Sequence, residues 1–195
     1  MPRRNLLTPA ERNSLMAFPT TDDELIQHYT LTEPDLSLIR QRRGSRNRLG
    51  FAVQLCYLRY PGFALPTDAE PPASLLSIVG RQLRIEPDIW PQYAQRSETR
   101  REHLLELQTW LKLTPFVASD YRHFVHQLTE QAQQTDRGIV LAKAMIEQLR
   151  QQRIILPTVD VIERVCSEAL TRGTRKVYEA LTASLTDFHR RELDG

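Results

Sequence analysis

The chain has 195 residues, which is long enough for one large helical domain or for two small ones. Its 26 basic and 24 acidic residues give a formal net charge of +2, so composition alone does not mark it as a nucleic-acid binder. No apolar stretch reaches the roughly 20 residues needed to span a bilayer, and the N-terminus lacks the apolar core of a signal peptide. Cys56 and Cys166 lie far apart within apolar runs, which favours buried thiols over a disulfide or a metal site. We therefore expect a soluble, cytoplasmic protein.

Helix start and stop signals follow one another along the chain. Thr8-Pro9-Ala10-Glu11 forms a capping-box pattern, and acidic residues mark two further helix starts at 20–24 and 32–35. Gly44 is expected to end the third helix near Arg43, with Ser45 capping the next. The Pro-rich stretch 61–72 indicates an extended loop. The expected helices after the third cover about 46–60, 73–84, 87–93, 97–113, 119–134 and 137–152.

The C-terminal part is expected to hold two helices separated by Gly173. Apolar residues recur at helical spacing before and after that glycine. One doubtful strand, Ile154-Ile155-Leu156, is too short to support a sheet. The predicted fold is therefore all-α, multi-helix, with two helical subdomains of helix-turn-helix type at 1–95 and 96–195. A division within 61–72 is the alternative.

The strongest local feature is the segment RQRRGSRNRLGFAVQLCYLRY, residues 40–60, which contains no acidic residue. A helix, a turn holding Gly44 and a second helix are the layout of a helix-turn-helix, whose second helix meets base edges with its first residues. The rest of this second helix is apolar on nearly every side, so only its first turn can reach DNA. A solvated basic turn between two structural helices is an equally weighted alternative. The candidate DNA contacts here are Arg40, Arg42, Arg43, Ser45, Arg46, Asn47, Arg48 and Arg59.

Three long segments resemble the N-terminal region of the Tn3-family transposases: LTPAERNSLMAFPTTDDELIQHYTLTEPDLSLIRQRRGSRNRLGFAVQLCYLRYPGFALP, ETRREHLLELQTWLKLTPF and ILPTVDVIERVCSEALTRGTRKVYEALT. The most specific part is RRGSRNRLGFAVQLCYLRYPG. The resemblance implies a bacterial transposon protein whose N-terminal helical domains bind double-stranded DNA at the terminal inverted repeats. It also implies a longer full-length transposase with a downstream DDE catalytic core, so we expect this chain to be a fragment, with self-association through the full-length protein left open.

Further basic residues would fit recognition in two parts. Arg96, Arg100 and Arg101 open the helix at 97–113, although interleaved glutamates favour a solvated face there. Arg122 lies with His123 and His126 on the polar side of the helix at 119–134, a second candidate for recognition. Around Gly173, Arg172, Arg175 and Lys176 are candidate phosphate contacts. The N-terminal Arg3-Arg4 is either a minor-groove arm or a plain terminus.

No pattern in the chain indicates catalysis. Asp22-Asp23-Glu24 reads as helix capping, because the carboxylates of a DDE site come from distant parts of a chain. His123 and His126 have no third ligand at a suitable spacing, and glycine-rich phosphate loops and nucleophile elbows are absent from the sequence. We therefore expect no enzyme activity, no cofactor, no metal and no membrane partner. The alternative to DNA binding is a helical protein–protein or dimerisation module, which the low net charge favours.

Overall fold

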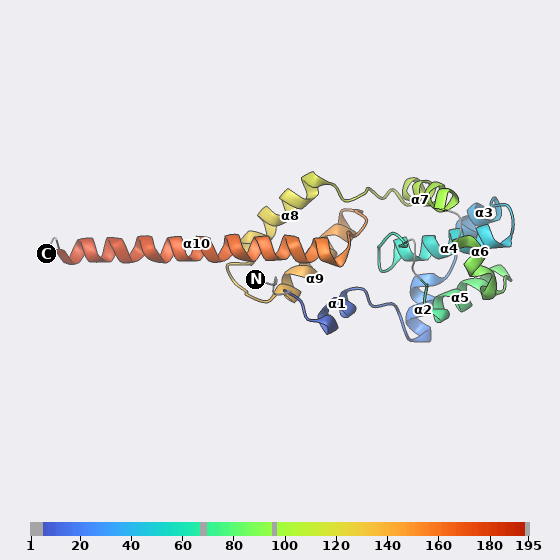
Figure 1. Ribbon diagram of the computed structural model, residues 1–195, viewed down its shortest axis with the longest axis horizontal. Helices are drawn as coiled ribbons and strands as arrows, with labels where there is room; N and C mark the ends of the chain where they lie inside the picture. Colours follow the sequence, from blue (N-terminus) through green and yellow to red (C-terminus); the bar gives the residue numbers. More distant parts are fainter. Residues whose placement is uncertain (1–5, 67–69, 95–96, 194–195) are drawn as a thin grey trace. The chain divides into compact units, whose positions relative to one another are not determined.

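The computed structural model describes residues 6–66, 70–94 and 97–193, and for 184–193 it describes the backbone only. These residues form ten α-helices and one short 3₁₀ helix, with two isolated β-bridges and no longer strand (Figure 1). The all-α prediction is confirmed. Ile154–Leu156 takes part in both bridges, pairing with Thr114 and Phe63, and so adds single links and no sheet.

The chain packs as two compact units, each described here by itself. Unit 2 comprises Met16–Pro115 together with Arg153–Leu156, and unit 1 contains the stretch ending at Leu15, Phe116–Gln152 and the chain from Pro157 onward. This packing does not follow the division at 95/96, because α7 packs on α4 of the same unit. The DNA-binding subdivision at 95/96 therefore stays a prediction. The helices of unit 2 are α2 (Asp22–Tyr29), α3 (Glu33–Arg40), α4 (Ser45–Arg59), α5 (Ala73–Leu83), η1 (Pro87–Ile89), α6 (Trp90–Ala94) and α7 (Ser97–Leu111).

Helix α4 is the centre of unit 2. Every residue from Leu49 to Leu58 is buried, and α2, α3, α5, α6 and α7 all pack against it (Figure 1). One close approach depends on a missing side chain: a Cβ on Gly50 would lie 2.2 Å from the ring of Tyr93 in α6. The ring of Tyr93 therefore lies directly on the α4 backbone. Since α4 is enclosed along its length, its exposed first turn is rigidly anchored.

Local capping explains where the first helices of unit 2 begin. The Thr21 hydroxyl accepts from the Glu24 backbone N–H while the Glu24 carboxylate accepts from the Thr21 backbone. Thr32 and Asp35 make the same reciprocal pair at α3. Within the acidic run at 22–24, Glu24 satisfies backbone donors at the helix N-terminus, while Asp22 and Asp23 lie in the first turn, where the helix dipole favours negative charge.

Unit 1 is built from α1 (Pro9–Leu15), α8 (Ala118–Gln131), α9 (Gly138–Gln151) and α10 (Val159–Leu193). The predicted helix break at Gly173 is wrong, because α10 runs through that residue and continues past α8 and α9 (Figure 1). Gly173 is buried, and a Cβ there would lie 2.9 Å from Cβ of Ala132 just past α8. The glycine therefore serves close helix packing, and helix α10 tolerates it in mid-course.

Both cysteines are free and buried, as their apolar surroundings predicted. Burial raises the pKa of the Cys56 thiol to about 12, and it does the same for Cys166. No helix among the described residues is both long and apolar enough to cross a bilayer.

Candidate nucleic-acid interface

The turn between α3 and α4 carries the densest group of arginines in unit 2. Gly44 has φ of +78°, a backbone conformation that L side chains rarely adopt, although a Cβ there would meet nothing within 4 Å. Glycine is therefore favoured at position 44 by the backbone conformation, and not by a lack of space for a side chain. Gly44 itself is the residue before α4, without a side-chain cap, so the expected capping by Ser45 is wrong: Ser45 is already the first helical residue. We call residues 40–48 the basic turn.

Two side chains of the basic turn are used to hold its shape. Arg48 donates from Nε to the Arg42 carbonyl at 3.0 Å and from Nη2 to the Arg40 carbonyl at 3.5 Å. Asn47 donates from Nδ2 to the Arg43 carbonyl at 3.0 Å. The last carbonyls of a helix have no partners within it, and a cation at that end is also favoured by the helix dipole. Asn47 and Arg48 therefore order the end of α3 and the turn.

Arg42 is held against the core of unit 2. Its guanidinium pairs with the Glu106 carboxylate of α7 at 2.5 Å and lies 4.9 Å from the ring centroid of Phe51. Its side chain is only 17% exposed. Phe51 is fully buried, so this cation–π contact fixes the guanidinium to an immobile ring.

Arg59, at the other end of α4, belongs to a core ion pair. Both its terminal nitrogens donate to the Asp35 carboxylate, at 2.6 and 2.9 Å, and Asp35 is 1% exposed. Burial alone would raise the pKa of Asp35, but hydrogen bonds from Arg59 and Thr32 outweigh it and hold that pKa below its usual value. The role of Arg59 is therefore structural: its ion pair with Asp35 holds α3 against α4.

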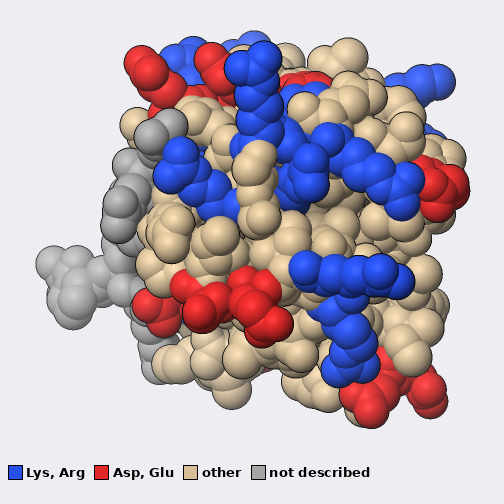
Figure 2. Space-filling view, turned by 90° about the vertical axis from the view of Figure 1, so that its right-hand side faces the viewer, with Lys and Arg blue, Asp and Glu red and all other residues tan. Residues whose placement is uncertain are grey.

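The remaining basic residues of the turn are not held in the core of unit 2. Arg43 is exposed and Arg46 is half-buried, and the structure gives neither of them an ion pair or side-chain hydrogen bond with another described residue. Arg40 pairs with Glu33 at 2.8 Å, but both side chains are more than 60% exposed, so this pair is weak and readily exchanged. Ser45 is exposed beside them. Figure 2 shows Lys and Arg gathered in a band across the face of unit 2 that carries α3 and α6, with acidic groups above and below the band and at its right edge.

Helix α7 contributes less to this surface than its sequence indicates. Arg100 is 7% exposed and donates to the Pro66 carbonyl, and its own backbone carbonyl accepts from Gln54 at 3.1 Å. Arg101 is exposed. Arg96, like Arg3 and Arg4, lies outside the described residues.

A buried polar cluster joins α4, α6 and α7. The Tyr93 hydroxyl lies 3.1 Å from Nδ1 of His103 and accepts from the Gln54 amide, and the Phe51 ring meets His103 edge-on at 5.0 Å. Burial, and then the charge of Arg42, lowers the pKa of His103 to about 4. His103 is therefore neutral at physiological pH and adds no positive charge beside Arg42.

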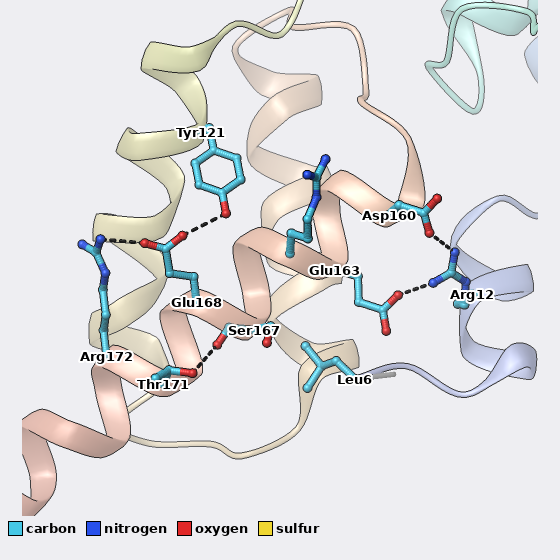
Figure 3. A pocket seen from close by; sticks show the side chains of 10 residues that line it. Leu6, Arg12, Tyr121, Asp160, Glu163, Ser167, Glu168, Thr171 and Arg172 are labelled. Atoms are coloured by element: carbon cyan, nitrogen blue, oxygen red, sulfur yellow. Dashed lines mark hydrogen bonds and ion pairs between the residues drawn. The ribbon is translucent and has the colours of Figure 1, made fainter. Parts of the chain in front are cut away.

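In unit 1 a pocket of about 690 Å³ lies between the N-terminal segment, α8 and α10 (Figure 3). Its carboxylates are already paired: Glu163 accepts from Arg12 and from the Leu7 backbone, while Glu168 accepts from Tyr121 at 2.9 Å and Arg172 at 2.6 Å. These contacts fasten the N-terminal segment and α8 to α10. The charged residues of this pocket therefore serve to join the segments of unit 1 to one another.

The other predicted residues of unit 1 are spread over its surface. Arg122 is exposed on α8, whose apolar stripe is buried as the periodicity predicted. Arg172 is half-exposed in its pair with Glu168, Arg175 lies 3.6 Å from Glu179, and Lys176 is exposed. The described residues contain no group of three or more His, Cys, Asp or Glu arranged to hold a metal ion. Sequence reasoning missed Glu33, which pairs with Arg40 from the start of the same helix α3, and Glu106, which pairs with Arg42 from α7.

These features define a class of protein: an all-helical domain with a buried central helix and a rigid, arginine-rich turn at the start of that helix. Residues 6–169 match the family described as a domain of unknown function (DUF4158), and the chain belongs to this family. It is 57% identical over 194 residues to the transposase for transposon Tn3926 of Escherichia coli and 55% identical to that for transposon Tn501 of Pseudomonas aeruginosa; each match covers 100% of this chain and 20% of the relative. The transposase for transposon Tn1546 of Enterococcus faecium is 33% identical over 98% of this chain and 19% of its own length.

These comparisons confirm the resemblance to Tn3-family transposases over the full chain. The chain spans about a fifth of the length of the curated relatives it matches.

Proposed function

We propose that the chain is the DNA-binding N-terminal region of a Tn3-family transposase and recognises the terminal inverted repeats of its transposon. The observation that carries the proposal is the basic turn: Arg43 and Arg46 point from a turn whose shape Asn47 and Arg48 already fix. Because the backbone of the turn is already ordered, only the side chains of Arg43 and Arg46 have to be ordered when they contact phosphates or base edges. Similarity to transposases over the whole chain supports the same role.

Within the basic turn we assign different roles to its residues. Arg46 lies in the first turn of the anchored helix α4, the position from which base edges are read in helix-turn-helix proteins. Arg40 and Arg43 flank it and are proposed to contact phosphate. Asn47 and Arg48 support the turn, and Arg42, Arg59 and Arg100 are left out of the contact set because their guanidinium groups are used within unit 2. Arg101, Arg122, Arg172, Arg175 and Lys176 remain proposed phosphate contacts of lower rank.

The test is a pair of titrations of the chain by fluorescence anisotropy. One duplex carries the terminal inverted repeat of transposon Tn3926, and the other carries the same bases in scrambled order. We expect tighter binding to the repeat. The proposed phosphate contacts of Arg40 and Arg43 together would contribute about −1.8 to the log–log salt slope, at roughly 0.9 per phosphate. Equal affinity for the two duplexes at every salt concentration would overturn the proposal.

We also propose that the chain by itself does not cut DNA, and that the catalytic carboxylates belong to other parts of the full-length transposase. Asp22 and Asp23 are neighbours in the first turn of α2, next to a complete capping box made by Thr21 and Glu24. Incubation of supercoiled plasmid carrying the repeat with the pure chain and Mg²⁺ or Mn²⁺ should leave the plasmid intact. Nicking that disappears in Asp22→Asn would contradict this part of the proposal.

A helical protein–protein module is the second candidate, favoured by α10. Tyr178 and Leu181 are 66% and 55% exposed on this helix. The occupant we propose for that face is a second copy of the chain, since a net charge of +2 gives two copies little mutual repulsion. Sedimentation equilibrium of the chain, compared with Leu181→Asp, decides this: a monomer at all concentrations would exclude it.

A further inference from the structure

Arg42 lies in the middle of the basic turn, yet its guanidinium is turned away from solvent. Glu106 of α7 pairs with it, and the buried ring of Phe51 lies beneath it. Its Nε is buried and makes no hydrogen bond to any described group. A charged group in this position is retained only while its partner carboxylate is present, because an unpaired buried charge is costly.

Helix α7 supplies both parts of this arrangement. Glu106 comes from the turn of α7 that follows His103, and His103 lies edge-on to the Phe51 ring at 5.0 Å. His103 in turn stacks on Tyr93 and lies within hydrogen-bonding distance of its hydroxyl, and the Phe51 ring that it meets is fully buried. The position of Arg42 is therefore set from a helix that is distant in sequence and carries none of the proposed base contacts.

We propose that Glu106 is a specificity-determining residue of the basic turn: by keeping Arg42 in the fold, it restricts the turn to the contacts of Arg40, Arg43 and Arg46. The inference rests on the proposed DNA-binding function. When the carboxylate is removed, rotation of the long Arg42 side chain into water relieves the unpaired charge. The released guanidinium then lies next to Arg43 and meets phosphate. Phosphate contacts carry no sequence information, so binding to any duplex gains and discrimination between duplexes falls.

The variant that tests this is Glu106→Gln, and Glu102→Gln is its matched control. Glu102 is exposed on the same helix, and none of the ion pairs or hydrogen bonds described in the structure joins it to Arg42. Both changes remove one negative charge. On scrambled duplex, Glu106→Gln should steepen the salt slope by about 0.9 beyond Glu102→Gln. Between 50 and 200 mM salt, this difference amounts to about a threefold larger loss of affinity.

Two further variants assign the effect to Arg42. Arg42→Gln alone should leave the salt slope of the parent unchanged, and the double variant Arg42→Gln/Glu106→Gln should lose the extra steepness. A slope for Glu106→Gln equal to that of Glu102→Gln would overturn the inference, as would extra steepness that persists without Arg42.

Proton exchange at Nε–H of Arg42, followed by NMR without DNA, separates this inference from the proposed function. Exchange should be slow in the parent and fast in Glu106→Gln. If the parent binds neither duplex, the proposed DNA-binding function is wrong. If exchange in the parent is fast, Glu106 does not retain Arg42 and the inference is wrong.

Discussion

Substitution of Gly50 by alanine is the sharpest test of how α4 is packed. A Cβ at this position would lie 2.2–2.3 Å from three ring atoms of Tyr93, whereas carbon atoms in contact prefer roughly 3.5–4.0 Å. Neither partner can easily move, because Gly50 lies in the buried middle of α4 and Tyr93 is hydrogen-bonded to Gln54 and to His103.

The expected loss of stability follows from three effects. Overpacking of a core costs about 1–3 kcal/mol, and each buried hydrogen bond of Tyr93 that breaks costs about 1 kcal/mol more. The better helix propensity of alanine returns about 1 kcal/mol. We expect unit 2 to lose about 2–3 kcal/mol, which lowers the melting temperature of a unit of this size by roughly 10 °C or more.

Tryptophan fluorescence measures this in unit 2 alone, because Trp90 and Trp110 are the two tryptophans of the chain and both lie there. Urea titrations of Gly50→Ala are compared with Tyr93→Ala and with the double variant. Removal of the ring makes room for the new Cβ, so the two losses should add to more than the loss in the double variant. Parent-like stability of Gly50→Ala, or strict additivity, would refute the reasoning.

Three other outcomes follow from the contacts. Arg48→Ala should destabilise unit 2 by about 1 kcal/mol and weaken DNA binding at constant salt slope, because its donors go to carbonyls; a slope reduced by about 0.9 would show a phosphate contact instead. Gly173→Leu should destabilise unit 1 by about 1–3 kcal/mol, because the new side chain collides with Ala132. Thermal unfolding followed by circular dichroism should show this loss, while the tryptophan fluorescence transition of unit 2 stays unchanged. A helical melting curve like that of the parent would count against this prediction. The folded-state pKa of His103, about 4, lies below its ordinary value of about 6.5, so the unfolded chain binds the extra proton between these values. The contribution of neutral His103 to the free energy of unfolding is therefore complete above about pH 6.5 and falls by up to about 3 kcal/mol toward pH 4. Urea titrations at pH 7, 5 and 4 measure this loss, which the variant His103→Gln should lack.

Local signals predicted the helices well. The capping boxes at Thr21 and Thr32 depend on residues three positions apart, which a sequence displays directly. The same holds for the apolar stripe of α8, where Phe124, Val125 and Leu128 are buried at helical spacing. The residues that determine these features all lie within one or two helical turns of one another in the sequence.

Glycines show where such information ends. Gly44 and Gly173 both read as helix breaks, but only Gly44 has a positive φ; it precedes α4, while α3 already ends at Arg40. Gly173 is required by Ala132, which lies just past α8, and no residue near Gly173 in sequence indicates this contact.

The arginines of the basic segment could not be told apart for the same reason. Arg42 and Arg59 differ from Arg43 and Arg46 through partners that lie 64 and 24 residues away, Glu106 and Asp35. A basic run in a sequence gives the number of charges, and only tertiary packing decides which of them remain available to DNA. The proposed interface is accordingly smaller than the run of arginines.

The division of the chain into units has a consequence for the order of folding during synthesis. Unit 1 contains both the stretch ending at Leu15 and helix α10, and the Leu7 backbone bonds to a carboxylate 156 residues away. The N-terminal segment therefore cannot complete its packing until α9 and α10 have left the ribosome. Most of unit 2 is synthesised in that interval and can fold first. A folded unit 2 turns a long flexible loop into a short one, which reduces the entropy that unit 1 loses when its first and last segments meet.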